Sequence, residues 1–119
     1  MRTILFASSL LLATLAQAHE TTGPNGGRVV DAGELHVELV SKGKSVDVFV
    51  TDANDKPLPI DGYKGMAVLV IDGKPQRIQL APAGANRLTG AAAINVPKTP
   101  RGAVQLQLPA GGSVQGRFQ

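Results

Sequence analysis

The stretch LHVELVSKGKSVDVFVT, residues 35–51, decides the fold class of this chain. Apolar and polar residues alternate through 35–41 and again through 45–51, which is the period-two pattern of half-buried strands. The Ser-Lys-Gly-Lys segment at 41–44 predicts a tight turn, because Gly43 can adopt a positive φ. The stretch therefore predicts a β-hairpin that buries one apolar face.

The register of this hairpin has a consequence for charge. A compact two-residue turn within 41–44 pairs positions whose numbers sum to 85, so that Leu39 meets Val46 and the apolar residues of both strands fall together. The same register sets Glu38 opposite Asp47, and like charges directly opposite are unfavourable. A bound cation or a nearby lysine would remove that penalty.

The rest of the chain predicts further short strands, separated by turns rich in Gly, Pro, Asp and Asn. Strands are expected over residues 28–32, 66–71, 76–80, 87–94, 103–108 and 113–118. Seven to eight short strands without convincing helical periodicity predict an all-β fold. The two candidate architectures are a small immunoglobulin-like β-sandwich and a Greek-key barrel.

The first 18 residues, MRTILFASSLLLATLAQA, have the form of a signal peptide. Arg2 gives the positive start, an apolar run follows, and Ala16-Gln17-Ala18 matches a cleavage site. The apolar run is shorter than the roughly 20 residues that span a bilayer, so we expect cleavage and no stable membrane insertion. The prediction is a periplasmic or secreted protein, with an irregular arm at 19–27 and one β domain at 28–119.

The composition and motifs of the sequence argue against several classes of function. The sequence has no cysteine, and its 12 Lys and Arg residues against 9 Asp and Glu are scattered singly, so no basic stripe for nucleic acid is expected. The serines lack a Gly-x-Ser-x-Gly frame, and no phosphate-binding loop occurs. We therefore expect a non-catalytic protein, whose only candidate chemistry lies with its two histidines.

These histidines predict a metal site for copper or zinc. Cleavage after Ala18 would make His19 the first residue, with an α-amine beside its imidazole, and His36 would complete a three-nitrogen site suited to Cu(II). Glu34 and Glu38 share the strand face of His36 because alternate residues point the same way. The predicted ligands are His19 and His36, with Glu38, Glu34 and Asp47 as weaker oxygen ligands or supports. The alternative is that this face is only the solvated side of an amphipathic strand.

Several stretches resemble a group of small exported bacterial β-proteins and the N-terminal domain of periplasmic adaptor subunits of heavy-metal efflux pumps. These stretches are GGRVV (26–30), GELHVELV (33–40), VFVTD (48–52), LAPAG (80–84) and NRLTG (86–90). In that group the first stretch commonly begins His-Gly-Gly, whereas this chain has Asn25 there; His36 and Glu38 match. The resemblance implies an accessory to metal efflux or homeostasis, with a metal ion or efflux-system proteins as partners.

A second hypothesis requires no metal. In it the β domain is an interaction module of an envelope assembly, which presents a strand edge or the proline-containing loop at 52–62. The histidines are then incidental. Neither hypothesis predicts an oligomeric state.

Overall fold

A computed structural model describes residues 21–119, and these residues form an all-β domain. Its nine strands are β1 (Thr21–Thr22), β2 (Arg28–Ala32), β3 (Leu35–Lys42), β4 (Ser45–Thr51), β5 (Lys64–Ile71), β6 (Lys74–Pro82), β7 (Arg87–Ala91), β8 (Arg101–Gln107) and β9 (Ser113–Phe118). Over these 99 residues (119 − 20) no helix is long and apolar enough to cross a membrane.

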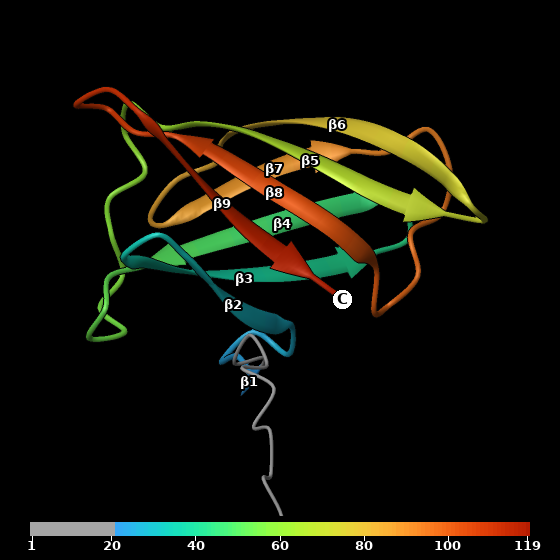
Figure 1. Cartoon of the computed structure of the whole chain (residues 1–119), viewed down its shortest axis with the longest axis horizontal. Helices are drawn as coiled ribbons and strands as arrows, with labels where there is room; N and C mark the ends of the chain where they lie inside the picture. Colours follow the sequence, from blue (N-terminus) through green and yellow to red (C-terminus); the bar gives the residue numbers. More distant parts are fainter. Residues whose placement is uncertain (1–20) are drawn as a thin grey trace, which may run out of the picture.

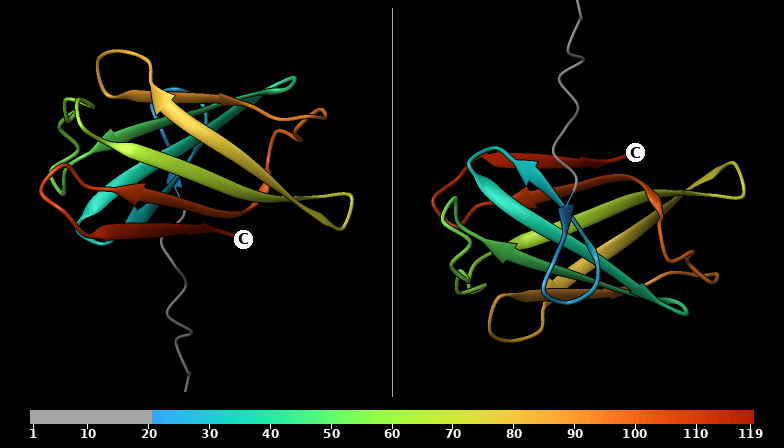
Figure 2. Two further views of the ribbon diagram at one scale, coloured as in Figure 1. Left: turned by 90° about the horizontal axis from the view of Figure 1, so that it is seen from above. Right: turned by 90° about the horizontal axis from the view of Figure 1, so that it is seen from below.

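The strands belong to one antiparallel sheet that closes on itself (Figure 1). The order is β1-β2-β3-β4-β7-β6-β5-β8-β9, and β2 also pairs with β9 through Ala32 and Gly116. Strands β2 to β9 therefore form an eight-stranded barrel, visible from both sides in Figure 2, while β1 pairs with the first half of β2. Because β8 returns beside β5 after the consecutive strands β5, β6 and β7, the connection is of the Greek-key kind.

The core of the barrel is almost wholly aliphatic. Alternate residues of each strand point inward, as the period of a strand requires. The fully buried side chains include Val37, Leu39, Val48, Leu69, Ile78, Leu88, Val104, Leu106 and Phe118. Phe118 is the one aromatic ring among them, which follows from a sequence with only three Phe, one Tyr and no Trp.

The strands expected at 28–32 and 113–118, and the second strand of the 35–51 hairpin, have the predicted bounds. The strand expected at 87–94 ends at Ala91, because the segment after it leaves the sheet. Of the two candidate architectures, the single closed sheet corresponds to the barrel, not to two separate packed sheets. The segment expected to be irregular, 19–27, includes the two-residue strand β1 among its described residues.

The register predicted for the β3–β4 hairpin is wrong by two residues. Leu39 pairs with Val48 instead of Val46, and Glu38 pairs with Phe49 instead of Asp47. The loop is Gly43 with the residue after it, and Gly43 has a φ of 59°, as the first position of a type II′ turn requires. A slip of two residues keeps every side chain on its own face, so alternation alone does not distinguish the two registers.

Candidate functional site

The outward face of β3 carries a buried carboxylate. Glu38 is only 4% exposed, although it points away from the barrel core. Its Oε2 accepts hydrogen bonds from the backbone N–H of Asn25 at 2.9 Å and of Gly27 at 2.8 Å, and its Oε1 accepts one from Asn25 Nδ2 at 2.9 Å. Each of these bonds is charge-assisted, so together they offset the cost of burying the acid.

Glycine and proline shape the segment that covers Glu38. A β-turn closes from Gly23 O to Gly26 N at 3.1 Å, with Pro24 at its second position, where proline is favoured. A Cβ on Gly23 would lie 2.3 Å from the Glu38 carboxyl carbon, and one on Gly27 would lie 2.3 Å from the Leu39 carbonyl oxygen. The close approach to the β3 backbone therefore requires glycine at 27, whereas a side chain at 23 would displace the Glu38 carboxylate from its hydrogen bonds.

His36 lies two residues before Glu38, between two carboxylates. Its Nδ1 is 2.7 Å from Asp55 Oδ1, and its Nε2 is 3.2 Å from Asp31 Oδ1. The His36 side chain is 27% exposed, whereas those of Asp31 and Asp55 are mostly exposed. Neutral imidazole can donate to one of these carboxylates, and imidazolium can donate to both.

Two different local structures bring these acids to His36. Asp31 is its direct cross-strand partner in the β2–β3 hairpin, which turns at Gly33 with a φ of 61°. Asp55 lies in the 52–56 loop, where Asp52 Oδ1 accepts hydrogen bonds from Asn54 N at 2.8 Å and Lys56 N at 2.9 Å. The loop thus has its own internal hydrogen bonds, which hold Asp55 over the end of β3.

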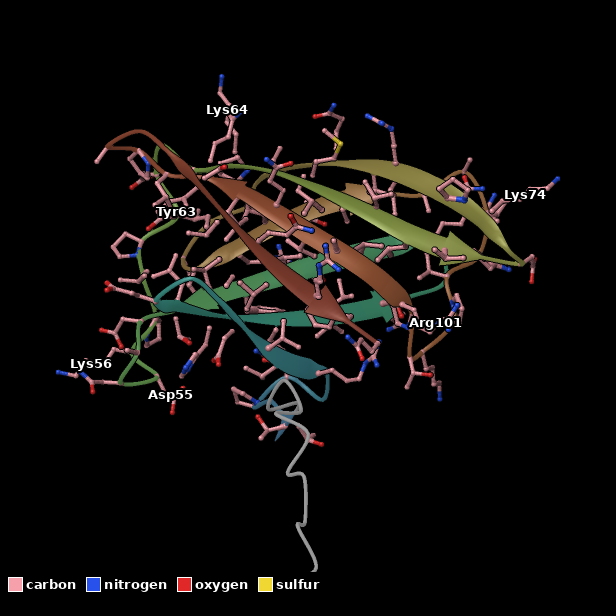
Figure 3. The ribbon with its side chains drawn as sticks, in the orientation of Figure 1. Asp55, Lys56, Tyr63, Lys64, Lys74 and Arg101 are labelled. Carbon is pink, nitrogen blue, oxygen red and sulfur yellow. The ribbon has the colours of Figure 1, made fainter. Side chains whose placement is uncertain are left out.

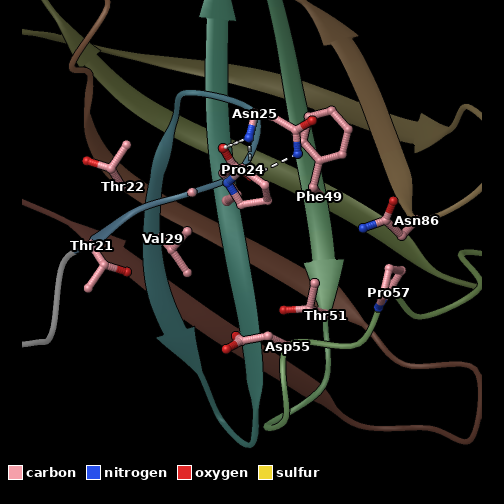
Figure 4. Close-up of a pocket in the computed structure, with 12 residues that line it drawn as sticks. Thr21, Thr22, Pro24, Asn25, Val29, Phe49, Thr51, Asp55, Pro57 and Asn86 are labelled. Carbon is pink, nitrogen blue, oxygen red and sulfur yellow. Dashed lines mark hydrogen bonds between the residues drawn. The ribbon is translucent and has the colours of Figure 1, made fainter.

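A hollow of about 440 Å³ lies between the covering arm and this loop (Figure 4). Its walls are Thr21, Thr22, Pro24 and Asn25 on one side, and Thr51, Asp55, Pro57 and Asn86 on the other, with Val29 and Phe49 between them. Asp55 both lines this hollow and contacts His36, so the His36 cluster borders the hollow.

The other predicted ligands lie apart from His36 or have other partners. Asp47 accepts a hydrogen bond from Thr89 Oγ1 at 2.6 Å and lies 3.7 Å from Arg87 Nη1. Glu34 is exposed in the β2–β3 turn, and Glu38 is bound by the arm. His19 lies outside the described residues.

Within residues 21–119 no three His, Cys, Asp or Glu side chains converge as a metal cluster. His36 and its two acids do not form such a cluster, because Asp31 and Asp55 contact different nitrogens of the imidazole ring. One ion bound at either nitrogen could therefore reach only one of the two carboxylates. Comparison of the chain with known protein families, curated proteins and solved structures gave no match.

Sequence reasoning missed both acids that contact His36. Asp31 could have been found, because a two-residue turn at Gly33-Glu34 pairs positions that sum to 67 and so sets Asp31 opposite His36. Asp55 gave no such signal, because it reaches His36 through a loop that no strand register predicts.

Proposed function

We propose that this protein is an exported, non-catalytic metal-binding protein that takes a divalent transition ion, copper or zinc, at His36. The observation that carries the proposal is the pair formed by His36 Nε2 and Asp31 Oδ1, 3.2 Å apart. Ligand atoms at about 2.0–2.2 Å from one ion, at square-planar or tetrahedral angles, lie about 2.8–3.6 Å apart. The pair therefore already has the spacing of two ligands of one ion.

Asp55 supports the same assignment from the other side of the ring. A ligating histidine usually donates its second ring N–H to a carboxylate, which fixes its tautomer and orientation. The 2.7 Å contact between Nδ1 and Asp55 Oδ1 has this form and leaves Nε2 for the ion. Asp31 and Asp55 thus take over the oxygen roles predicted for Glu38 and Asp47, which have other hydrogen-bond partners.

His19 is the proposed third ligand, through its α-amine and imidazole. Thr22 of β1 pairs with Arg28 of β2, and Thr21 pairs with Val29. The earlier residue of β1 therefore lies nearer to Asp31 along β2. The described arm thus ends at Thr21 beside β2, the strand that carries Asp31. This supports His19, which precedes Thr21 by two residues in the sequence, as the third ligand.

The proposed cellular role rests on the sequence. The N-terminal leader and the resemblance to efflux-adaptor domains support a role as a periplasmic accessory to metal efflux or homeostasis. A metal-independent interaction module, possible for the same β domain, is the competing function.

Calorimetric titration with Cu(II) and Zn(II) tests the proposal. We expect saturable binding of one ion to the mature protein, and loss of that binding in His36→Ala and Asp31→Ala. Glu34→Ala is the matched control, because it removes an exposed acid of the same hairpin. Binding that is unchanged by His36→Ala would refute the site, and absence of binding by the unmodified protein would favour the interaction module.

A further inference from the structure

Four neighbouring strands of the barrel, β6, β5, β8 and β9, contain no acidic residue. They contain five basic residues instead. These residues are scattered singly along the sequence, and only the strand order brings them together. Four of them, the exposed Lys64, Arg77, Arg101 and Arg117, point outward and define what we call the cationic face.

The register places these cations in rows across the sheet. In one row Arg77 pairs with Val68, Val68 with Ala103, and Ala103 with Arg117. Two arginines therefore flank a small apolar centre, three strands apart, or about 14–15 Å measured along the curved sheet at the usual strand spacing. Arg101 lies in the next row, opposite the exposed Val70.

A shallow hollow lies within the same face. It has a volume of about 240 Å³ and is lined by Lys64, Gly65, Met66, Gln79, Gln105 and Gln107. One ammonium group and three carboxamides thus surround a space of the size of a small polar group, and none of the lining groups is negatively charged. Donors of this kind bind phosphate oxygens.

The acidic residues that the structure describes lie outside these four strands. Figure 3 shows Lys64 and Asp55 projecting to opposite sides of the barrel. Within the described residues no carboxylate lies within ion-pair distance of the four cations of this face. The nearest acids along the chain, Asp61 and Asp72, are in the turns that flank β5.

We propose that the cationic face docks on an anionic phospholipid surface, with a headgroup phosphate in the hollow at Lys64. The cations are spread over four adjacent strands, which suits an extended array of anionic headgroups more than a single small anion. A protein interface would be expected to carry aromatic anchors at its centre, and a single-stranded nucleic acid needs rings for stacking. The only aromatic residue of these four strands, Phe118, is buried in the core.

The test is co-sedimentation of the metal-free protein, with chelator present, with vesicles made of equal parts of phosphatidylcholine and phosphatidylglycerol. We expect binding that weakens as salt is raised, and no binding to pure phosphatidylcholine. A triple variant, Arg77→Gln with Arg101→Gln and Arg117→Gln, should bind about 100-fold more weakly, since each cation near such a surface contributes about a factor of 5.

The matched control carries Lys42→Gln, Lys44→Gln and Lys56→Gln, which lowers the net charge equally but lies off the face. It should bind as the unmodified protein does. Equal losses in both triple variants would overturn the proposal, because they would reflect net charge alone. Binding to polyglutamate or to duplex DNA without binding to the vesicles would also overturn it. Because the metal is chelated, failure here leaves the proposal for His36 unaffected.

Discussion

The carboxylate of Glu38 accepts a hydrogen bond from the backbone N–H of Gly27 at 2.8 Å, although Glu38 belongs to the outward side of β3. Two further bonds from Asn25 complete its coordination by amide groups. The acid therefore fixes the N-terminal arm against the barrel, next to His36. The side-chain amide of Asn25 is one of these donors.

Removal of this carboxylate should destabilise the protein. Glu38→Ala would leave three N–H donors without their acceptor, and we expect the free energy of unfolding to fall by about 2–4 kcal/mol. Urea denaturation followed by circular dichroism measures this. Glu34→Ala, at an exposed position of the same hairpin, should change it by less than about 0.5 kcal/mol. Equal effects of the two variants would contradict the account of Glu38.

The close approach of the arm to β3 predicts a contrast between two adjacent glycines. Gly27→Ala places a methyl group 2.3 Å from the Leu39 carbonyl oxygen, so we expect a loss of at least about 2–3 kcal/mol. The methyl group of Gly26→Ala would meet no atom within 4 Å. The only cost is the φ of 80°, which should lower the free energy of unfolding by about 1 kcal/mol. Thermal denaturation of both variants measures the difference. A smaller loss for Gly27→Ala than for Gly26→Ala would be inconsistent with this packing.

The barrel closes between β2 and β9, where Ala32 and Gly116 are the only residues paired in the sheet. The stability of this closure therefore depends on side-chain contacts. Arg28 donates to the Pro100 and Gln119 carbonyls, and its guanidinium lies 5.7 Å from the ring centre of Phe118. Phe118 itself is 2% exposed.

Phe118→Ala should therefore cost about 3–5 kcal/mol in the free energy of unfolding. Phe49→Ala removes the same group from the half-buried outward side of β4, and we expect a clearly smaller loss. Guanidinium denaturation of the two variants measures both values. A larger loss for Phe49→Ala would mean that the barrel is not closed through Phe118.

Asp55 should affect metal affinity without being a ligand. Asp55→Asn keeps the size of the side chain but removes the carboxylate that receives His36 Nδ1–H, so we expect binding about 10–100-fold weaker. Asp61→Asn, an exposed acid on the 52–63 connection, should leave the affinity unchanged. Competition titration with a chromophoric chelator gives both constants. Unaltered affinity in Asp55→Asn would exclude the orienting role.

Much of the fold could be predicted from local pattern. Alternation identified the strands around residues 35–51, and turn residues separated them from their neighbours. The hairpin register could not be predicted this way, because a shift of two residues buries the same valines. The closure of the sheet through Gly116 and Ala32 is a long-range contact with no local signature.

The site was predictable only in part. The alternation of side chains along a strand correctly predicted that His36 and Glu38 lie on the outward face of one strand. It could not show that the 23–27 arm would cover Glu38, because that depends on glycine packing against β3. The cationic face was missed for a similar reason, since its residues are neighbours across strands and not along the chain.

Nitrogen NMR of the histidine rings during titration of the mature protein with Zn(II) tests the central claim most directly. The sequence contains only two histidines, so the His36 signals can be assigned with His36→Gln. We predict that the Nε2 resonance of His36 shifts to the position of a metal-bound nitrogen, while Nδ1 stays protonated against Asp55. Unchanged His36 resonances at saturating zinc, or coordination through Nδ1, would contradict the proposed site.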